Sequence, residues 1–312
     1  MSLSTVLGGC YVALSTVCIV PYVLCLKVMF EKKFRKLSCY KVMINYGLAD
    51  LIQLFCHVIA GCLLILEITL PFGLNKLFGA VIDGIGWMSY MMFGALLASE
   101  RYIQMCKPHT NGKWFVKKIY VWIIVSWLVG VVWFLVYLSP WVNFTFLAKT
   151  YAFYFGPEAS LNHVAQITAF WLNTAQMVFM CVCYVLILVR VRKEVKHVND
   201  SEVAAAQKKE RMLMVQAALI CLYTLVEQIY FDVRGYFLPK DNNLYSIIGN
   251  FMWILNGGIN PLIYLTLNRN VRSGVLKMFG CGVKQVQSNE MRVMTRTNSA
   301  SNILWHSAQE QE

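Results

Sequence analysis

Long apolar stretches alternate with short polar segments along this chain of 312 residues. Seven stretches contain about 20 residues or more, the length a helix needs to cross the roughly 30 Å hydrocarbon core of a bilayer. They cover residues 6–30, 40–70, 77–99, 119–138, 164–189, 212–231 and 244–267, with long connections only at 139–163 and 190–209. Helices are expected because lipid cannot satisfy an open backbone. The pattern predicts an all-α membrane protein: a seven-transmembrane helix bundle over residues 1–280 and a disordered cytoplasmic tail over residues 281–312.

The composition agrees with a membrane protein. Hydrophobic residues make up 58% of the chain and charged residues 14%, whereas a soluble domain averages about 45–50% and about 25%. The net charge of +12 would also suit nucleic acid, but its distribution excludes that partner. All of the 28 basic residues except Lys76, Lys149, Arg234 and Lys240 fall on one side of the predicted spans. The positive-inside rule makes that side the cytosol and places the N-terminus outside.

Nothing in the sequence indicates an enzyme, a metal or a cofactor. There is no Ser/His/Asp set, HExxH motif or phosphate-binding loop, and the eleven cysteines form no CxxC pair. These cysteines are expected to pack as small apolar residues. The first apolar run has no basic leader and is too long for the core of a signal peptide, so it is expected to be the first span itself.

The third and seventh stretches carry polar motifs near one membrane surface. These motifs are Glu100-Arg101-Tyr102, and Asn260-Pro261 with Tyr264 three residues further on. A charge at such a boundary can simply extend its side chain to water. A proline removes a backbone donor and kinks its helix. A kinked helix end of this kind is a physically sensible place for a conformational switch.

Asp50 lies inside the second stretch, in the triplet Leu48-Ala49-Asp50. A carboxylate within a membrane helix is costly unless it faces a partner or water, so it is a functional candidate by default. Asn256 and Asn260 in the seventh stretch are candidate hydrogen-bond partners. The alternative is a purely structural polar network.

Other candidates lie in the outer halves of the spans. Asp83 precedes Arg101 by 18 residues, five turns of an α-helix, which predicts the same helix face about 27 Å toward the outside. There it would attract a cationic ligand, unless it pairs with Arg234 or lies among the headgroups. Further ligand-binding candidates are Trp87, Asn173, Gln176, Glu227, Gln228 and Trp253. Each could be structural, although an acid at the depth of Glu227 is expected to face the bundle.

Three features flank the spans. Residues 268–279 form an amphipathic segment suited to lying along the inner leaflet as a short eighth helix, and Cys281 behind it is either S-palmitoylated or unmodified. Asn143 begins a glycosylation sequon on the outer side, close to the fourth span. The serines and threonines of the tail are open to phosphorylation.

The two polar motifs, in the right helices and order, resemble those of rhodopsin-like G-protein-coupled receptors. The narrower resemblance is to the nematode chemosensory serpentine receptors of the Srt class. It rests on residues 21–25, 34–43, 253, 257–258, 261–265 and 268–272. The sequence lacks the family's outer-loop cysteines, its Trp and Pro in the sixth span and its Pro in the fifth. It also has no lysine in the seventh span, so a retinal Schiff base is not expected.

The resemblance implies a receptor in the plasma membrane, in particular that of a sensory cilium. It would bind a small molecule among the outer helices and activate a heterotrimeric G protein. Glu100 would hold Arg101 in the inactive state, and Tyr264 would swing inward on activation. The replacement of the usual serine by Tyr90 leaves a sodium ion near Asp50 in doubt. Two alternatives remain: a receptor for an internal amine or peptide transmitter, and a membrane protein of another kind, such as a transporter.

Overall fold

The structure is a computed structural model that describes residues 2–106, 115, 117–156, 159–194, 215, 218–231 and 243–280. Its first three long helices are α1 (Leu3–Met29), α3 (Ser38–Leu66) and a continuous helix composed of α4 (Phe72–Gly79), η1 (Ala80–Met88) and α5 (Ser89–Cys106). They are followed by α7 (Ile119–Leu138), α8 (Asn162–Glu194), the helix Ala218–Phe231 and α10 (Leu244–Leu267). The smaller elements are α2 (Lys32–Arg35), β1 (Phe144–Leu147), β2 (Ala152–Phe155) and α11 (Arg269–Met278).

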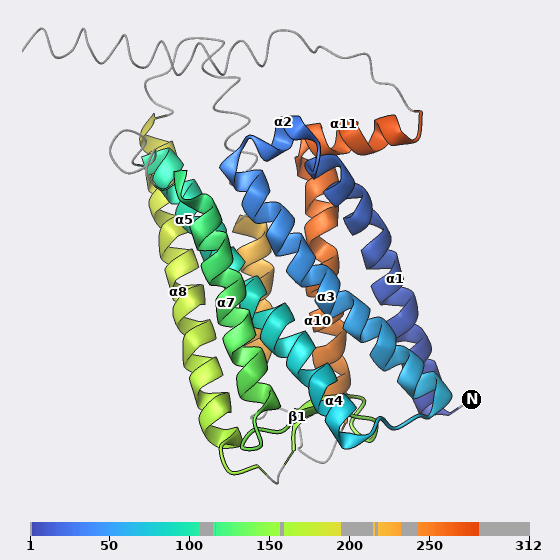
Figure 1. Cartoon of the computed structure of the whole chain (residues 1–312). Helices are drawn as coiled ribbons and strands as arrows, with labels where there is room; N and C mark the ends of the chain where they lie inside the picture. The colour runs from blue at the N-terminus through green and yellow to red at the C-terminus, as the bar shows by residue number, and fades with distance from the viewer. Residues whose placement is uncertain are drawn as a thin grey trace, which may run out of the picture.

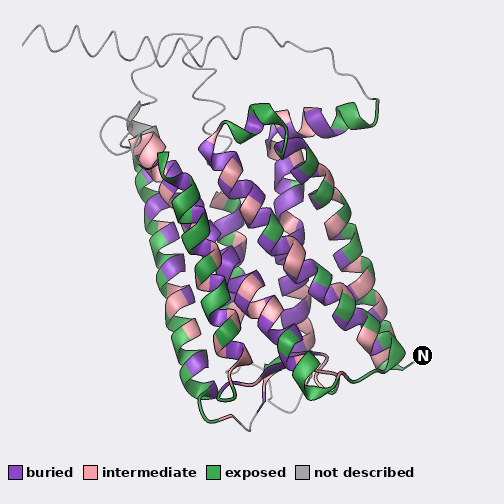
Figure 2. Cartoon of the chain, in the orientation of Figure 1, coloured by how far each residue is buried: buried purple, intermediate pink, exposed green. Residues whose placement is uncertain are grey.

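The long helices stand side by side as a bundle (Figure 1). The strands and the N-terminus lie at one end, which we call the hairpin end, and α2 and α11 lie at the other, which we call the α11 end. Five helices among the described residues are long and apolar enough to cross a membrane. Exposed residues occur along the outer helices of the bundle (Figure 2). They include large apolar side chains, such as Val178, Val182 and Val185 on α8. Such a surface suits contact with lipid.

Small residues set the closest approach between helices. A Cβ built on Gly8 of α1 would lie 2.5 Å from the carbonyl oxygen of Gly61 on α3, and a Cβ on Gly61 would lie 2.7 Å from the carbonyl oxygen of Gly8. Glycines at such crossings let helix backbones pack closely where lipid gives no hydrophobic driving force. The α1–α3 contact is therefore fixed by these two positions.

The third helix differs most from its prediction. It runs over Phe72–Cys106 rather than 77–99, and η1 within it is a π-helix of nine residues. Gly84 of η1 packs against α7, where an added Cβ would lie 2.5 Å from the backbone nitrogen of Phe134. A π-helix bonds i to i+5 and turns less per residue than an α-helix. The count of five α-helical turns from Asp83 to Arg101 was therefore based on a wrong helical period.

A two-stranded antiparallel sheet closes the hairpin end, where we expected only a long loop. It pairs Phe144 with Phe155 and Leu147 with Ala152. Asn75 of α4 holds β1 with both ends of its amide: Nδ2 donates to the carbonyl of Phe146 at 2.8 Å, and Oδ1 accepts from its N–H at 2.9 Å. These two hydrogen bonds tie β1 to the start of the third helix.

The α11 end is organised by Asn268. Its side chain caps α11 by accepting from the N–H of Val271 at 3.2 Å and also donates to the Tyr40 hydroxyl at 3.0 Å. The contact of α11 with the inner leaflet remains a prediction. Cys281 and the tail over residues 281–312 lie outside the described residues.

Candidate functional site

A buried ion pair occupies the α11 end of the third helix. The Nε of Arg101 lies 2.7 Å from Oε2 of Glu100. Both residues are almost wholly removed from solvent, at 3% and 0% exposure. A buried pair of this kind needs further hydrogen bonds to offset the loss of hydration.

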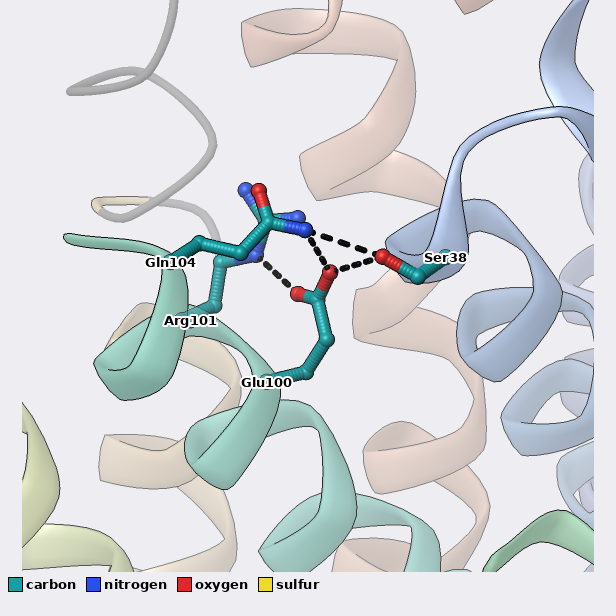
Figure 3. A network of polar contacts seen from close by, with 4 residues as sticks. All are labelled: Ser38, Glu100, Arg101 and Gln104. Carbon is teal, nitrogen blue, oxygen red and sulfur yellow. Dashed lines mark hydrogen bonds and ion pairs between the residues drawn. The ribbon is translucent and has the colours of Figure 1, made fainter. Parts of the chain in front are cut away.

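Those further bonds come from Ser38 and Gln104 (Figure 3). The hydroxyl of Ser38, the first residue of α3, donates to Oε1 of Glu100. The amide of Gln104, one turn beyond Glu100, donates to the same oxygen at 2.5 Å and to the Ser38 hydroxyl at 2.9 Å. We call these four residues the Glu100 network. It ties the third helix to α3 through the carboxylate of Glu100.

The other predicted switch residues lie close to this end. Tyr102 is half-buried against the core, and Tyr264 is fully buried on α10. The ring of Tyr264 packs edge-on against Tyr22 of α1, with 6.4 Å between centroids. Pro261 lies within α10, as predicted from its sequence.

Asp50 lies deeper in the bundle and joins three helices. It accepts hydrogen bonds from the Tyr22 hydroxyl of α1 and from Nδ2 of Asn260 on α10, the latter at 2.7 Å. The contact with Asn260 is the one expected from the sequence. Sequence reasoning missed Tyr22, although a hydroxyl in the first span is a signal once the usual Asn is lacking there.

Asn256 belongs to a separate layer toward the hairpin end. Its Oδ1 accepts from the Tyr90 hydroxyl at 3.0 Å, and Tyr90 also shares a 2.8 Å hydrogen bond with Thr224. The sequence suggested Asn256 as a partner of Asp50, but its described hydrogen bonds run to Tyr90 and Thr224. Tyr90 thus joins the third, sixth and seventh helices.

Aromatic side chains gather in the hairpin half of the bundle. Trp87 stacks on Tyr90, with 5.5 Å between centroids, and meets Trp253 edge-on at 5.8 Å. Trp253 donates from Nε1 to Gln53 at 2.6 Å and packs against Phe153 of β2 at 6.0 Å. The structure therefore brings together the predicted Trp87 and Trp253 and adds Gln53, which the sequence did not single out.

Four predicted polar candidates on the fifth and sixth helices are buried. Asn173 and Gln176 lie on α8, and Nε2 of Gln176 is 2.9 Å from the sulfur of Met92. Glu227 is fully buried, and neither carboxylate oxygen has a hydrogen-bond partner in the described part of the chain. Gln228 beside it is also buried.

Asp83 and Asn143 stand apart from that group. The carboxyl of Asp83 lies beside the hydroxyl of Tyr137 on α7, and Arg234, its suggested partner, is outside the described residues. Asn143 lies just before β1, with its side chain against Gly156. A ligand contact at Asp83 and glycosylation at Asn143 both remain predictions.

The bundle, the Glu100 network and the Asp50–Asn260 contact define a seven-helix receptor of the rhodopsin type. The fold matches the crystal structure of squid rhodopsin with a TM-score of 0.74 and 16% sequence identity, over 89% of this chain and 80% of the rhodopsin chain. The chain belongs to the family of serpentine type 7TM GPCR chemoreceptors Srt, whose pattern matches residues 2–289.

Curated relatives include vertebrate opsins. Medium-wave-sensitive opsin 1 of Rattus norvegicus is 26% identical over 226 residues, which cover 67% of this chain and 60% of the opsin. Rhodopsin of Sargocentron spiniferum is 24% identical over 295 residues, which cover 89% of this chain and 83% of the rhodopsin. The chain thus spans less than two thirds of the length of the rat opsin.

Proposed function

We propose that this protein is a chemosensory receptor that binds a small molecule in the hairpin half of the bundle and activates a heterotrimeric G protein at the α11 end. The single observation that carries this proposal is the Glu100 network. Its charged groups are buried and hydrogen-bonded, yet Arg101 would become available to a partner if the contact with α3 opened.

One continuous helix connects the two halves. Trp87 and Tyr90 lie toward its hairpin end, and Glu100 and Arg101 lie near its other end. A ligand that binds one arrangement of this helix more tightly than another shifts the population between them. By linkage, the same shift changes the affinity of the α11 end for the G protein.

The setting follows from the same proposal. The protein lies in the plasma membrane, of a sensory cilium in particular, with its N-terminus outside and its basic loops against the G protein and anionic lipid. Glycosylated Asn143 would face outward and palmitoylated Cys281 inward. The phosphorylated tail would recruit arrestin after action of a receptor kinase.

The test is G-protein activation in cells that carry a promiscuous G protein. Basal calcium signalling and responses to a mixed panel of small molecules would be recorded for the original protein, Arg101→Ala and Lys149→Ala. Lys149 is the control because it is exposed and lies between β1 and β2, at the end away from the proposed G-protein contact. We expect Arg101→Ala to abolish signalling and Lys149→Ala to preserve it, at equal surface expression.

Two outcomes would overturn the proposal. Signalling that persists unchanged in Arg101→Ala would remove the role of the Glu100 network. Transport of a labelled substrate without any G protein, also unchanged in Arg101→Ala, would identify a transporter instead.

A further inference from the structure

Glu227 is a buried acid that the proposed switch does not use. Both of its carboxylate oxygens lack a hydrogen-bond partner among the described residues. Leaving such a group unpaired in a low-dielectric interior is costly, and intramembrane acids of this kind mark binding sites by default. Glu227 therefore lacks the partner that its chemistry calls for.

The helix face of Glu227 places it among aromatic rings. Thr224, Glu227 and Phe231 lie at i, i+3 and i+7, so they share one face of the helix Ala218–Phe231. Thr224 bonds Tyr90 at 2.8 Å, and the Phe231 ring lies 6.4 Å from that of Trp253. Glu227 thus lies between a layer that contains Tyr90 and a layer that contains Trp253.

Trp87 connects these two layers, since it stacks on Tyr90 and meets Trp253 edge-on. Tyr90 also lies within electrostatic reach of Glu227. Aromatic faces attract cations, tryptophan most strongly, and cages of such rings are typical of ammonium recognition. The Tyr90 ring already stacks on Tyr46 at 4.5 Å as well as on Trp87, so Trp87 and Trp253 are the rings left to line a site near the Glu227 carboxylate. A carboxylate combined with these two rings suits a positively charged amine.

Two more unpartnered acceptors lie on α8. Oδ1 of Asn173 and Oε1 of Gln176 are buried and have no hydrogen-bond partner in the described part of the chain. Gln176 shares a face of α8 with Met180, one turn away, and the Met180 sulfur lies 3.6 Å from that of Cys221 on the helix that carries Glu227. Asn173 lies one turn closer to the hairpin end than Gln176. All three side chains present acceptors, so the missing group is a hydrogen-bond donor.

The charge of the interior points the same way. Asp50 lies within electrostatic reach of Glu227, and its own hydrogen bonds come from neutral groups, Tyr22 and Asn260. The buried lysine and arginine among the described residues are Lys76 and Arg101, which lie on opposite ends of the third helix. The middle of the bundle therefore favours a cation over an anion.

We propose that Glu227 is the counter-ion for a primary ammonium ligand that packs against Trp87 and Trp253, with Asn173 and Gln176 as further acceptors. This inference rests on the proposed function as a small-molecule receptor and names the class of its ligand. Asp83, which lies beside Tyr137, is the competing acid, and the experiment compares the two.

The test is direct binding to the full-length protein purified in detergent. Thermal stabilisation would be measured with methylammonium, phenethylammonium, neutral 2-phenylethanol and anionic 3-phenylpropanoate. We expect stabilisation by phenethylammonium, none by the anion, and an affinity for the alcohol lower by about tenfold or more, because it lacks the charge-assisted hydrogen bond.

Two substitutions then test which acid binds the ammonium. Glu227→Gln should reduce the affinity for phenethylammonium by about tenfold or more, whereas Asp83→Asn, the control acid, should leave it unchanged. The comparison of the three phenyl probes on the unmodified protein stands even if Glu227→Gln fails to fold.

Three results would overturn the inference: equal binding of the neutral alcohol, loss of binding in Asp83→Asn instead of Glu227→Gln, or no stabilisation by either ammonium. Binding is measured without a G protein, so the two proposals can fail separately. If signalling depends on Arg101 but neither ammonium binds, this inference alone is contradicted. Ammonium binding without Arg101-dependent signalling would sink the proposed function alone.

Discussion

Two buried glutamates in this bundle differ in their hydrogen bonding. Glu100, at the α11 end, receives bonds from Arg101, Ser38 and Gln104. Glu227, toward the hairpin end, is as deeply buried and receives none from the described residues. A carboxylate that is paired within the protein stabilises one arrangement of the helices. A carboxylate without a partner in the protein is stabilised only when a ligand supplies one.

The difference separates the two tasks of a receptor. In the proposed function, the α11 end would hold a closed state that a partner opens, and the hairpin half would provide an acceptor for a ligand. Each acid is expected to respond to neutralisation with the opposite sign of stability change, because only Glu100 loses a partner when its charge is removed.

The largest effect is expected from Glu100→Gln. Removing one charge of a buried pair leaves Arg101 uncompensated, which costs about 3–5 kcal/mol. The matched control is Glu31→Gln, which breaks an exposed pair with Lys33 and is expected to cost under about 1 kcal/mol. Thermal unfolding in detergent would measure both, and equal midpoints for the two variants would contradict the role given to Glu100.

Ser38→Ala is expected to have the next largest effect. It removes a hydrogen bond to a charged group, worth about 1.5–3 kcal/mol, and it loosens the link between α3 and the third helix. We expect a lower unfolding midpoint together with higher basal G-protein signalling, and Ser38→Thr should restore both. A fall in stability with no rise in basal signalling would make Ser38 a structural residue only.

Glu227→Leu is expected to act in the opposite direction on the ligand-free protein. It replaces an unpartnered buried carboxyl with an apolar group of similar size, which removes a penalty of about 1–3 kcal/mol. The unfolding midpoint should therefore rise. A fall as large as that of Glu100→Gln would show that Glu227 is structurally paired, and the comparison between the two acids would collapse.

Much of the fold follows from the sequence because lipid imposes simple rules. The seventh span was predicted at 244–267, and α10 has those bounds, since Asn243 and Asn268 end the apolar run clearly. The third span was predicted too short. The helix adds residues at both ends, 72–76 and 100–106, and the π-helix η1 inside the predicted span was not foreseen. Gly79 and Gly84 make close contacts with other parts of the chain, which a linear pattern does not contain.

In the candidate site, too, some contacts could be predicted from the sequence and others could not. The pairing of Glu100 with Arg101 is local, so neighbouring residues suffice to predict it. Ser38 lies 62 positions away from Glu100 along the chain, and Tyr22 reaches Asp50 from another helix. Such partners depend on how the helices pack, so the sequence could name the acids but not what satisfies them.

The smallest effect is expected at the sheet of β1 and β2, which packs against Trp253 through Phe153. Asn75→Ala removes both hydrogen bonds to Phe146, a loss of about 1 kcal/mol because water can partly replace them at this half-buried position. Hydrogen exchange of β1 should accelerate several-fold while the amides of α5 around Glu100 keep their protection. Thr150→Ala, which removes one local turn bond, is the control. Faster exchange at both ends of the bundle would mean that the sheet and the Glu100 network open together, and the independence of the two regions would then be lost.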